Sequence, residues 1–244
     1  MESNQTQSKT LTYPYPKRRP FFNLVLKIGR LIKKRPYILN RNETFQRQAI
    51  FISNHSGASG PMNLALFFPS FFIPWGASPM VGNYFSRWKY LYYVFYQQKL
   101  GYKKFRSFFI ATLFALISKR LYKGMDLIPT YEDLRLVKTF RLSENFLLDD
   151  KPIFIFPEDS SKGYLDHILH YHEGFLAFAE YFFQKHGIDL PIYTVGFSKK
   201  KNKMIIEKPM YLQQLYAQGM NRHQAAQHFK DLTNALVIEI QRMK

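Results

Sequence analysis

Apolar and polar positions along the chain alternate between short apolar runs and longer stretches with helical spacing. Short runs bounded by polar, Gly or Pro residues predict strands, and apolar residues at i, i+3, i+4 and i+7 predict helices. The predicted strands are 48–53, 126–129, 152–156, 191–197 and 203–208, and the predicted helices are 61–66, 84–98, 106–122, 132–148, 171–185 and 222–243. Strands that alternate with helices in this way predict an α/β fold, a mixed β-sheet flanked by helices.

Two of the predicted helices carry expectations about burial. In 132–148 the helical period predicts that five residues face the core: Leu134, Val137, Leu142, Phe146 and Leu147. The apolar run 108–117 is bounded by Arg106 and Lys119. It is too short to cross a membrane, which takes about 20 apolar residues. We therefore expect it to form a buried helix or an aromatic-rich surface that dips into lipid.

Segment 21–36 has the pattern of a basic amphipathic helix. Its apolar residues share one helical face, its Lys and Arg residues fall mostly elsewhere, and Pro36 ends the pattern; the apolar residues are Phe21, Leu24, Val25, Ile28, Leu31 and Ile32. Such a helix either lies in the headgroup layer of an anionic membrane or docks on its own domain. The predicted organisation is a flexible segment 1–20, a membrane-surface helix 21–36 and one α/β domain 37–244.

Composition narrows the class of partner. The 244 residues are 46% hydrophobic and 18% aromatic, enough for one sizeable core. A formal charge of +18 favours an anionic partner, which could be membrane lipid, nucleic acid or an acidic carrier protein. No recognised nucleic-acid module is present, and basic residues cluster around the apolar face of 21–36, so we expect no nucleic-acid partner.

The cellular location follows from what the sequence lacks. Without cysteine there is no disulfide and no cysteine nucleophile, which is compatible with a reducing cytoplasm. The polar start MESNQTQSKT argues against a secretory signal peptide. We expect a peripheral protein on the cytoplasmic face of a membrane.

Two motifs about a hundred residues apart carry the chemistry. FISNHSGASGP contains Asn54-His55, and FIFPEDSSKGY contains Phe156-Pro157-Glu158. Together they resemble the lysophospholipid acyltransferase family, which includes the glycerol-3-phosphate and 1-acylglycerol-3-phosphate acyltransferases. Three further blocks in the family's order, 123–129, 190–195 and 205–209, extend the resemblance over residues 49–243.

The resemblance implies acyl transfer from acyl-CoA or acyl carrier protein, as co-substrate, to a hydroxyl of a lipid-like acceptor, with no further cofactor. His55 is implied as general base, and imidazole suits this role because its ordinary pKa of about 6.5 lies near working pH. The implied substrate-binding residues are Asn54, Ser56, Gly124, Thr130, Glu158, Ser160 and Lys162. The implied partners are the acyl donor and an anionic lipid surface.

The chain departs from the family at Gly60, where the family has the Asp that orients the base. Loss of an orienting Asp in a serine-protease triad costs about 10⁴ in rate without abolishing catalysis. Three outcomes remain open: a substitute carboxylate, for which Asp159 is our choice, a backbone carbonyl as orienter, or an inactive protein; Ser56 and Ser59 could also bond the ring. Gly60→Asp would raise activity if the orienting group is merely missing and lower it if a carboxylate already serves.

Two arginines associated in the family with acceptor phosphate are also absent. Ser161 stands at one of these positions and Thr130 lies near the other. Because a guanidinium fork suits phosphate, we expect phosphomonoester acceptors to be poor substrates. Lys162 or Lys123 could substitute as point charges.

Two alternative interpretations stay open. The polar cluster Asp166, His167, His170, His172 and Glu173 contains zinc-ligand residue types, but its spacing is not a zinc pattern, and we expect no metal. The main alternative to an enzyme is an inactive family member that binds lipid or an acidic partner at the membrane surface.

Overall fold

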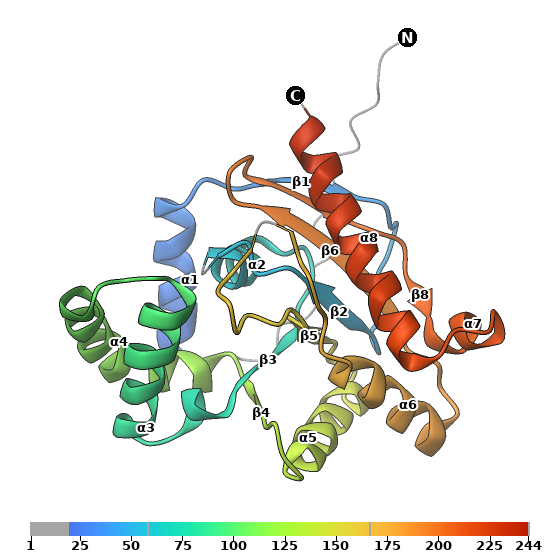
Figure 1. Ribbon diagram of the computed structural model, residues 1–244, viewed down its shortest axis with the longest axis horizontal. Helices are drawn as coiled ribbons and strands as arrows, with labels where there is room; N and C mark the ends of the chain where they lie inside the picture. Colours follow the sequence, from blue (N-terminus) through green and yellow to red (C-terminus); the bar gives the residue numbers. More distant parts are fainter. Residues whose placement is uncertain (1–19, 58, 166, 244) are drawn as a thin grey trace.

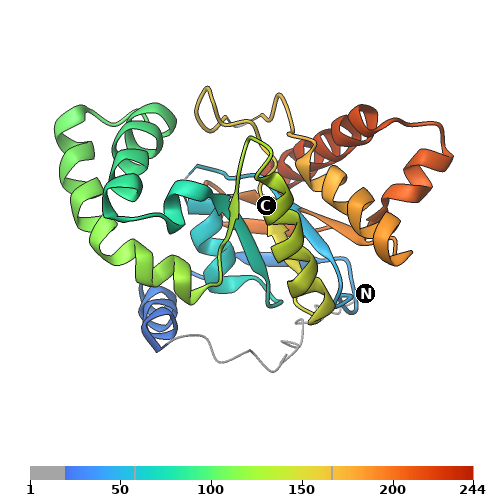
Figure 2. The same cartoon turned by 90° about the horizontal axis from the view of Figure 1, so that it is seen from below.

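The computed structural model describes residues 20–57, 59–165 and 167–243, and its centre is an eight-stranded mixed sheet (Figures 1 and 2). Seven strands follow the order β1-β7-β6-β2-β5-β3-β4, and β8 pairs with β6. Helices pack around this sheet, so the predicted α/β fold with a mixed sheet and flanking helices is confirmed.

The middle of the sheet is parallel and buried. β2 (Ile50–Ser53) lies between β5 (Ile153–Ile155) and β6 (Pro191–Ser198), and both neighbours run parallel to it. Beyond β5 the parallel strands β3 (Ile73–Ala77) and β4 (Ile128–Thr130) complete one side. The consequence is that β2 and β5 end at the same edge of the sheet.

The opposite side of the sheet contains its antiparallel pairs. β7 (Lys203–Ile206) runs antiparallel to β6, and β1 (Tyr37–Asn40) lies parallel to β7 at the border. β8 (Met210–Tyr211) also pairs antiparallel with β6. β6 thus belongs to the parallel and the antiparallel part of the sheet at once.

Side-chain alternation along β2 separates two cores. Ile50 and Ile52 join a core of aliphatic and aromatic residues with the helices after β5, while Phe51 points to the other face and stacks with Phe154 and Tyr193. The helices of the first core are α5 (Leu136–Leu148), α6 (Gly174–His186), α7 (Leu212–Ala217) and α8 (Arg222–Arg242). On the second face lies α2 (Ser59–Phe67).

A group of helices stands at the other side of the molecule from α6, α7 and α8 (Figures 1 and 2). We call it the helical lobe: α1 (Pro20–Ile32), η1 (Ser78–Val81), α3 (Tyr84–Lys89), the π-helix η2 (Tyr90–Lys99) and α4 (Lys104–Gly124). α3, η2 and α4 pack on one another, and α1 packs on α4 and α2.

The predicted elements are present, with shifted ends. The helix predicted over 84–98 consists of two parts, α3 and the π-helix η2, and the helix predicted from Pro61 begins at Ser59. β1, β3, β8 and α7 were not predicted, because each is short and β3 contains a proline.

The predicted inward face of α5 is partly wrong. Phe146 and Leu147 pack on the core, but Leu134, Val137 and Leu142 are exposed. The buried face instead contains polar side chains with bonding partners: the Thr139 hydroxyl donates to the carbonyl of Pro129, and Ser143 accepts from the indole of Trp75. Such satisfied polar groups can be buried at low cost, and a hydrophobic pattern does not reveal them.

The predicted amphipathic helix is α1, and it docks on its own domain through an unpredicted face. Phe22 is buried against Gly124 of α4, and Gly29 lies against Leu66 of α2. The residues of the predicted apolar face that follow Phe21 are largely exposed, with Leu31 81% accessible to solvent. The flexible segment predicted over 1–20 lies, except for Pro20, outside the described residues.

Candidate functional site

The site forms where β2 and β5 end side by side. His55 follows β2 after one residue, and Glu158 follows β5 after Phe156 and Pro157. Because the two strands are parallel neighbours, the loops that leave their carboxyl ends meet at one edge of the sheet. The sheet register therefore brings the two predicted motifs together.

The carboxylate of Glu158 binds His55 twice. Its Oε2 atom accepts a hydrogen bond from the His55 backbone N–H at 3.0 Å and lies 3.3 Å from the ring nitrogen Nδ1. A carboxylate only accepts hydrogen bonds, so this contact favours the tautomer with the proton on Nδ1. The lone pair of Nε2 is then available as a base.

Two aromatic rings enclose the imidazole. The Phe156 ring centroid lies 4.7 Å from that of His55, and the Tyr164 centroid lies 4.5 Å away. The side chain of His55 is 16% exposed. Burial lowers the pKa of His55 below its ordinary value, although the hydrogen bond and charge of Glu158 raise it; the nearby charge of Lys99 adds to the lowering. His55 is therefore neutral at pH 7.

The backbone at Gly60 excludes the family's carboxylate. A Cβ atom at residue 60 would lie 1.9 Å from the carbonyl oxygen of His55. Any side chain there would force the His55 turn to move, so an Asp at 60 does not fit this backbone. Glu158 supplies the carboxylate from the other motif.

Asp159 is not the substitute carboxylate, which corrects our sequence-based choice. Its Oδ1 atom accepts from the backbone N–H of Ser161 at 2.9 Å and lies 3.9 Å from Nε2 of His172. Glu158 forms a β-bridge with Tyr171, and in extended backbone successive side chains point to opposite sides. Glu158 therefore faces His55 while Asp159 faces away from it.

Asn54 and Ser56 hold the loop rather than present free polar groups. The buried Asn54 amide accepts from the backbone N–H of Phe197 at 2.9 Å and donates to its carbonyl at 2.9 Å. Ser56 has a positive φ of 45°, and its hydroxyl accepts from the backbone N–H of Lys199 at 3.0 Å. These bonds fix the His55 turn to the end of β6, so both predicted binding residues position His55.

Lys99 is a site residue that sequence reasoning missed. It ends the π-helix η2, and its ammonium group donates to the hydroxyl of Ser160 at 2.7 Å. The same group lies 5.8 Å from the centre of the Tyr164 ring. Burial lowers the pKa of Lys99, while the charges of Glu158, Glu132 and Asp159 raise it. Of the predicted binding residues, Ser160 thus joins the site through Lys99.

Three predicted binding residues are occupied elsewhere or exposed. Gly124 packs against Phe22 of α1, and the Thr130 hydroxyl donates to the carbonyl of Gly76, joining β4 to β3. Lys162 is exposed within the loop of the second motif, and Lys123 is exposed in the last turn of α4. Lys99 is in electrostatic contact with Glu158.

Comparison of the chain with family models, with curated proteins and with solved structures finds no match. The resemblance to acyltransferases therefore rests on the motifs quoted above. The main chemical features of the site are the contact of Glu158 with the His55 ring and the nearby ammonium group of Lys99.

The second polar cluster does not form a metal site among the described residues. Its members have separate partners: His172 approaches Asp159, and Glu173 accepts from Nδ1 of His223 at 2.9 Å. Asp166 lies outside the described residues.

Proposed function

We propose that the protein transfers a fatty acyl group from acyl-CoA or acyl carrier protein to a hydroxyl of a lipid-like acceptor. The observation that carries the proposal is the contact of the Glu158 carboxylate with Nδ1 of His55. It supplies the orienting acid whose loss at Gly60 would otherwise argue against catalysis. A buried, neutral imidazole held by a carboxylate is the arrangement that general-base catalysis requires.

The proposed step uses the His55 ring as a proton carrier. Nε2 removes the proton of the acceptor hydroxyl as its oxygen attacks the thioester carbonyl carbon. Glu158, through its contact with Nδ1, stabilises the imidazolium that forms. When the tetrahedral intermediate collapses, the carbon–sulfur bond breaks, and the imidazolium returns its proton to the leaving thiolate.

Lys99 has a separate role in this proposal. Its ammonium group is part of the site, and its position is fixed by the Ser160 hydroxyl. A cation held in a partly buried site stabilises negative charge more strongly than one in water. We assign Lys99 to the negative charge that develops on the thioester oxygen.

One observation favours the second candidate, an inactive lipid-binding protein. The rings of Phe156 and Tyr164 enclose the imidazole and leave little of its surface accessible. An acceptor hydroxyl would have to reach Nε2 through the small part of the side chain that is exposed. Activity measurements on site variants separate the two candidates.

The decisive variants are His55→Ala and Glu158→Gln, with Asp159→Asn as matched control. A panel of acyl-CoA and acyl carrier protein donors with lipid alcohol acceptors reports the transfer. We expect His55→Ala to abolish it and Glu158→Gln to lower the rate by about 10³ to 10⁴, as loss of an orienting carboxylate does. Asp159→Asn, whose carboxylate faces away from the ring, should retain activity within about twofold.

Wild-type turnover equal to that of His55→Ala across the whole panel would contradict the proposal that the protein is an acyltransferase. The inactive lipid-binding protein would then be the better account. Loss of activity in Asp159→Asn with Glu158→Gln unaffected would instead return the orienting role to Asp159.

The proposal also predicts which lipid acceptors the protein prefers. Because both family arginines are replaced, we expect glycerol-3-phosphate and lysophosphatidic acid to be poorer acceptors than a neutral or zwitterionic lipid alcohol. A competition assay measures the ranking. If the two phosphomonoesters rank first, the expectation is wrong, and comparison of Lys99→Met with Lys162→Met identifies the phosphate contact.

A further inference from the structure

The longest helix of the lobe, α4, buries small residues and exposes most of its large apolar residues. The buried stripe of α4 contains Ser107, Ala111, Ala115 and Ser118. The outward stripe is large and apolar, and Phe105 is 78%, Leu113 67% and Leu116 62% exposed; Phe108, Phe109 and Ile117 complete it. A helix that packs in water normally shows the reverse arrangement.

The interior of the lobe combines an aromatic-rich apolar cluster around Leu91 and Tyr96 with buried polar groups. Arg87 of α3 is buried, and its guanidinium donates to the Ser118 hydroxyl at 3.2 Å and to the carbonyl of Ala115 at 3.0 Å. Small residues at helix contacts, with polar groups bonded between helices and large apolar residues outside, are typical of helices in lipid. None of the helices in the described ranges has the length and apolar character needed to cross a membrane.

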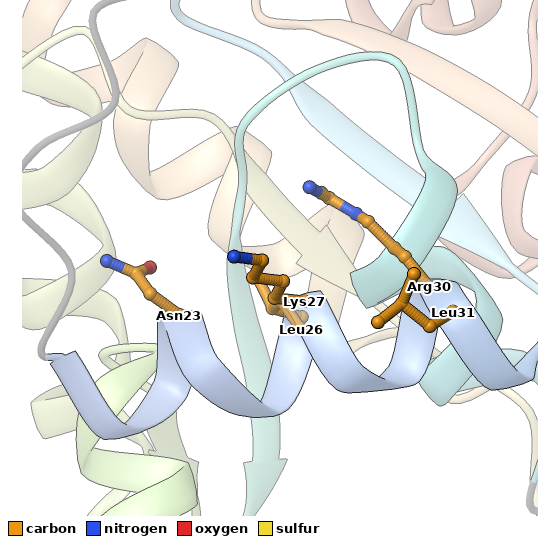
Figure 3. Close-up of a pocket in the computed structure, with 5 residues that line it drawn as sticks. All are labelled: Asn23, Leu26, Lys27, Arg30 and Leu31. Atoms are coloured by element: carbon orange, nitrogen blue, oxygen red, sulfur yellow. The ribbon is translucent and has the colours of Figure 1, made fainter.

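α1 adds a second apolar stripe with cations beside it. Leu24, Ile28, Leu31 and Ile32 are exposed along this helix, which packs on α4. A hollow of about 360 Å³ on α1 is lined by Asn23, Leu26, Lys27, Arg30 and Leu31, and Lys27 and Arg30 rise from the same side of the helix (Figure 3). Apolar side chains next to cations match the boundary between acyl chains and phosphate headgroups.

The net positive charge of the chain comes from the half of the sequence that contains the lobe. Residues 1–125 hold 20 of the 35 basic residues and 2 of the 17 acidic ones, whereas residues 126–244 hold 15 of each. The net charge of +18 therefore belongs entirely to the first half, and no acid occurs between Glu43 and Asp126. Basic residues without acidic neighbours favour anionic lipid and repel positively charged partners.

We propose that the helical lobe docks on an anionic lipid bilayer, with the outward stripes of α4 and α1 inserted at the headgroup level. A second copy of this chain fits the lobe less well, because it would bring two strongly positive surfaces together. α4 begins at Lys104, five residues after Lys99 of the site. If the protein is the proposed acyltransferase, docking of α4 would present the site to an acceptor in the bilayer.

The test is sedimentation of the full chain with vesicles of phosphatidylcholine, with and without phosphatidylglycerol. We expect binding to the anionic vesicles that weakens with salt, because exposed charges are screened. The double variant Leu113→Gln/Leu116→Gln should bind at least about tenfold more weakly, since two inserted side chains are lost. Leu134→Gln/Leu169→Gln, two exposed leucines from the neutral half, is the matched control and should bind as wild type.

Three results would overturn the proposal. The first is equal binding by the α4 variant and wild type, and the second is equal weakening by the control variant. The third is a dimer without lipid, seen by sedimentation velocity, that the α4 variant dissociates, because a second copy would then cover the lobe. Vesicle binding needs no turnover, so an inactive protein that still binds refutes only the acyl transfer.

Discussion

α4 and α8 are both 21 residues long and pack in opposite ways. α8 buries Phe229, Leu236 and Ile240 against the sheet and turns most of its polar residues to solvent. α4 buries alanine and serine and leaves phenylalanine and leucine outside. The comparison shows that an apolar stripe identifies a surface that avoids water, while the neighbouring elements decide whether protein or another apolar medium covers it.

Truncation of one phenylalanine in each helix tests this comparison with the largest expected effect. Phe229 of α8 is fully buried, so Phe229→Ala should lower the free energy of unfolding by about 4 kcal/mol. Phe109 of α4 is half exposed, so Phe109→Ala should change it by less than about 0.5 kcal/mol. Urea unfolding measures both. Similar losses in the two variants would mean that α4 is covered by protein in solution.

A substitution at Gly60 tests the close contact between α2 and the backbone of His55. Gly60→Ala places a Cβ atom against the His55 carbonyl, so we expect a loss of about 3 kcal/mol, at the upper end for overpacking. Gly60→Asp should lose stability similarly and also lower activity, because Glu158 already orients the ring. Gly174→Ala is the control, since its Cβ would meet no atom within 4 Å. An Asp variant that is stable and more active would refute the role of Glu158.

Close glycine contacts offer a smaller test. A Cβ at Gly196 of β6 would lie 2.6 Å from Cβ of Leu236 in α8, and one at Gly124 of α4 would lie 2.5 Å from Cβ of Phe22 in α1. Gly196→Ala should cost about 2 kcal/mol by urea unfolding, because sheet and helix cannot separate. Gly124→Ala should cost less and increase hydrogen exchange in α1, because that helix can shift. Equal costs without a change in exchange would show that α1 is held as firmly as α8.

The sequence predicted the parts of the site that follow directly from the two buried strands. The apolar runs of β2 and β5 predicted strands, and the motifs after them predicted the loops that contain His55 and Glu158. Which carboxylate meets the ring depends on the bridge between Glu158 and Tyr171, a pairing that spacing alone does not indicate. Asp159 was chosen wrongly for that reason.

Other parts of the site depend on contacts between distant segments. Lys99 reaches the site because a π-helix ends beside the loop with Ser160, and neither feature has a sequence signal that we recognised. α1 was predicted as a helix, but its docked face depends on Gly124 and Leu66, which lie on other elements. The hydrophobic pattern predicted the apolar stripe of α1. It could not predict which elements of the fold that helix would contact.

The central claim is that His55 is a neutral base, oriented by Glu158 from the loop after β5 and influenced by the charge of Lys99 from the helical lobe. Titration of the His55 imidazole by nitrogen-15 NMR tests it without a known substrate. Removal of the two neighbours should shift its pKa in opposite directions, because Glu158 raises the pKa of His55 and Lys99 lowers it. Activity should fall as pH drops through that pKa, because only the neutral ring accepts a proton.

We expect the wild-type ring to be neutral at pH 7, protonated on Nδ1, with a pKa below its ordinary value. Glu158→Gln should lower this pKa further and Lys99→Met should raise it, while Asp159→Asn, as the control, should change it least. A wild-type pKa above 6.5, the Nε2-protonated tautomer, or a pKa that Glu158→Gln leaves unchanged would contradict the account.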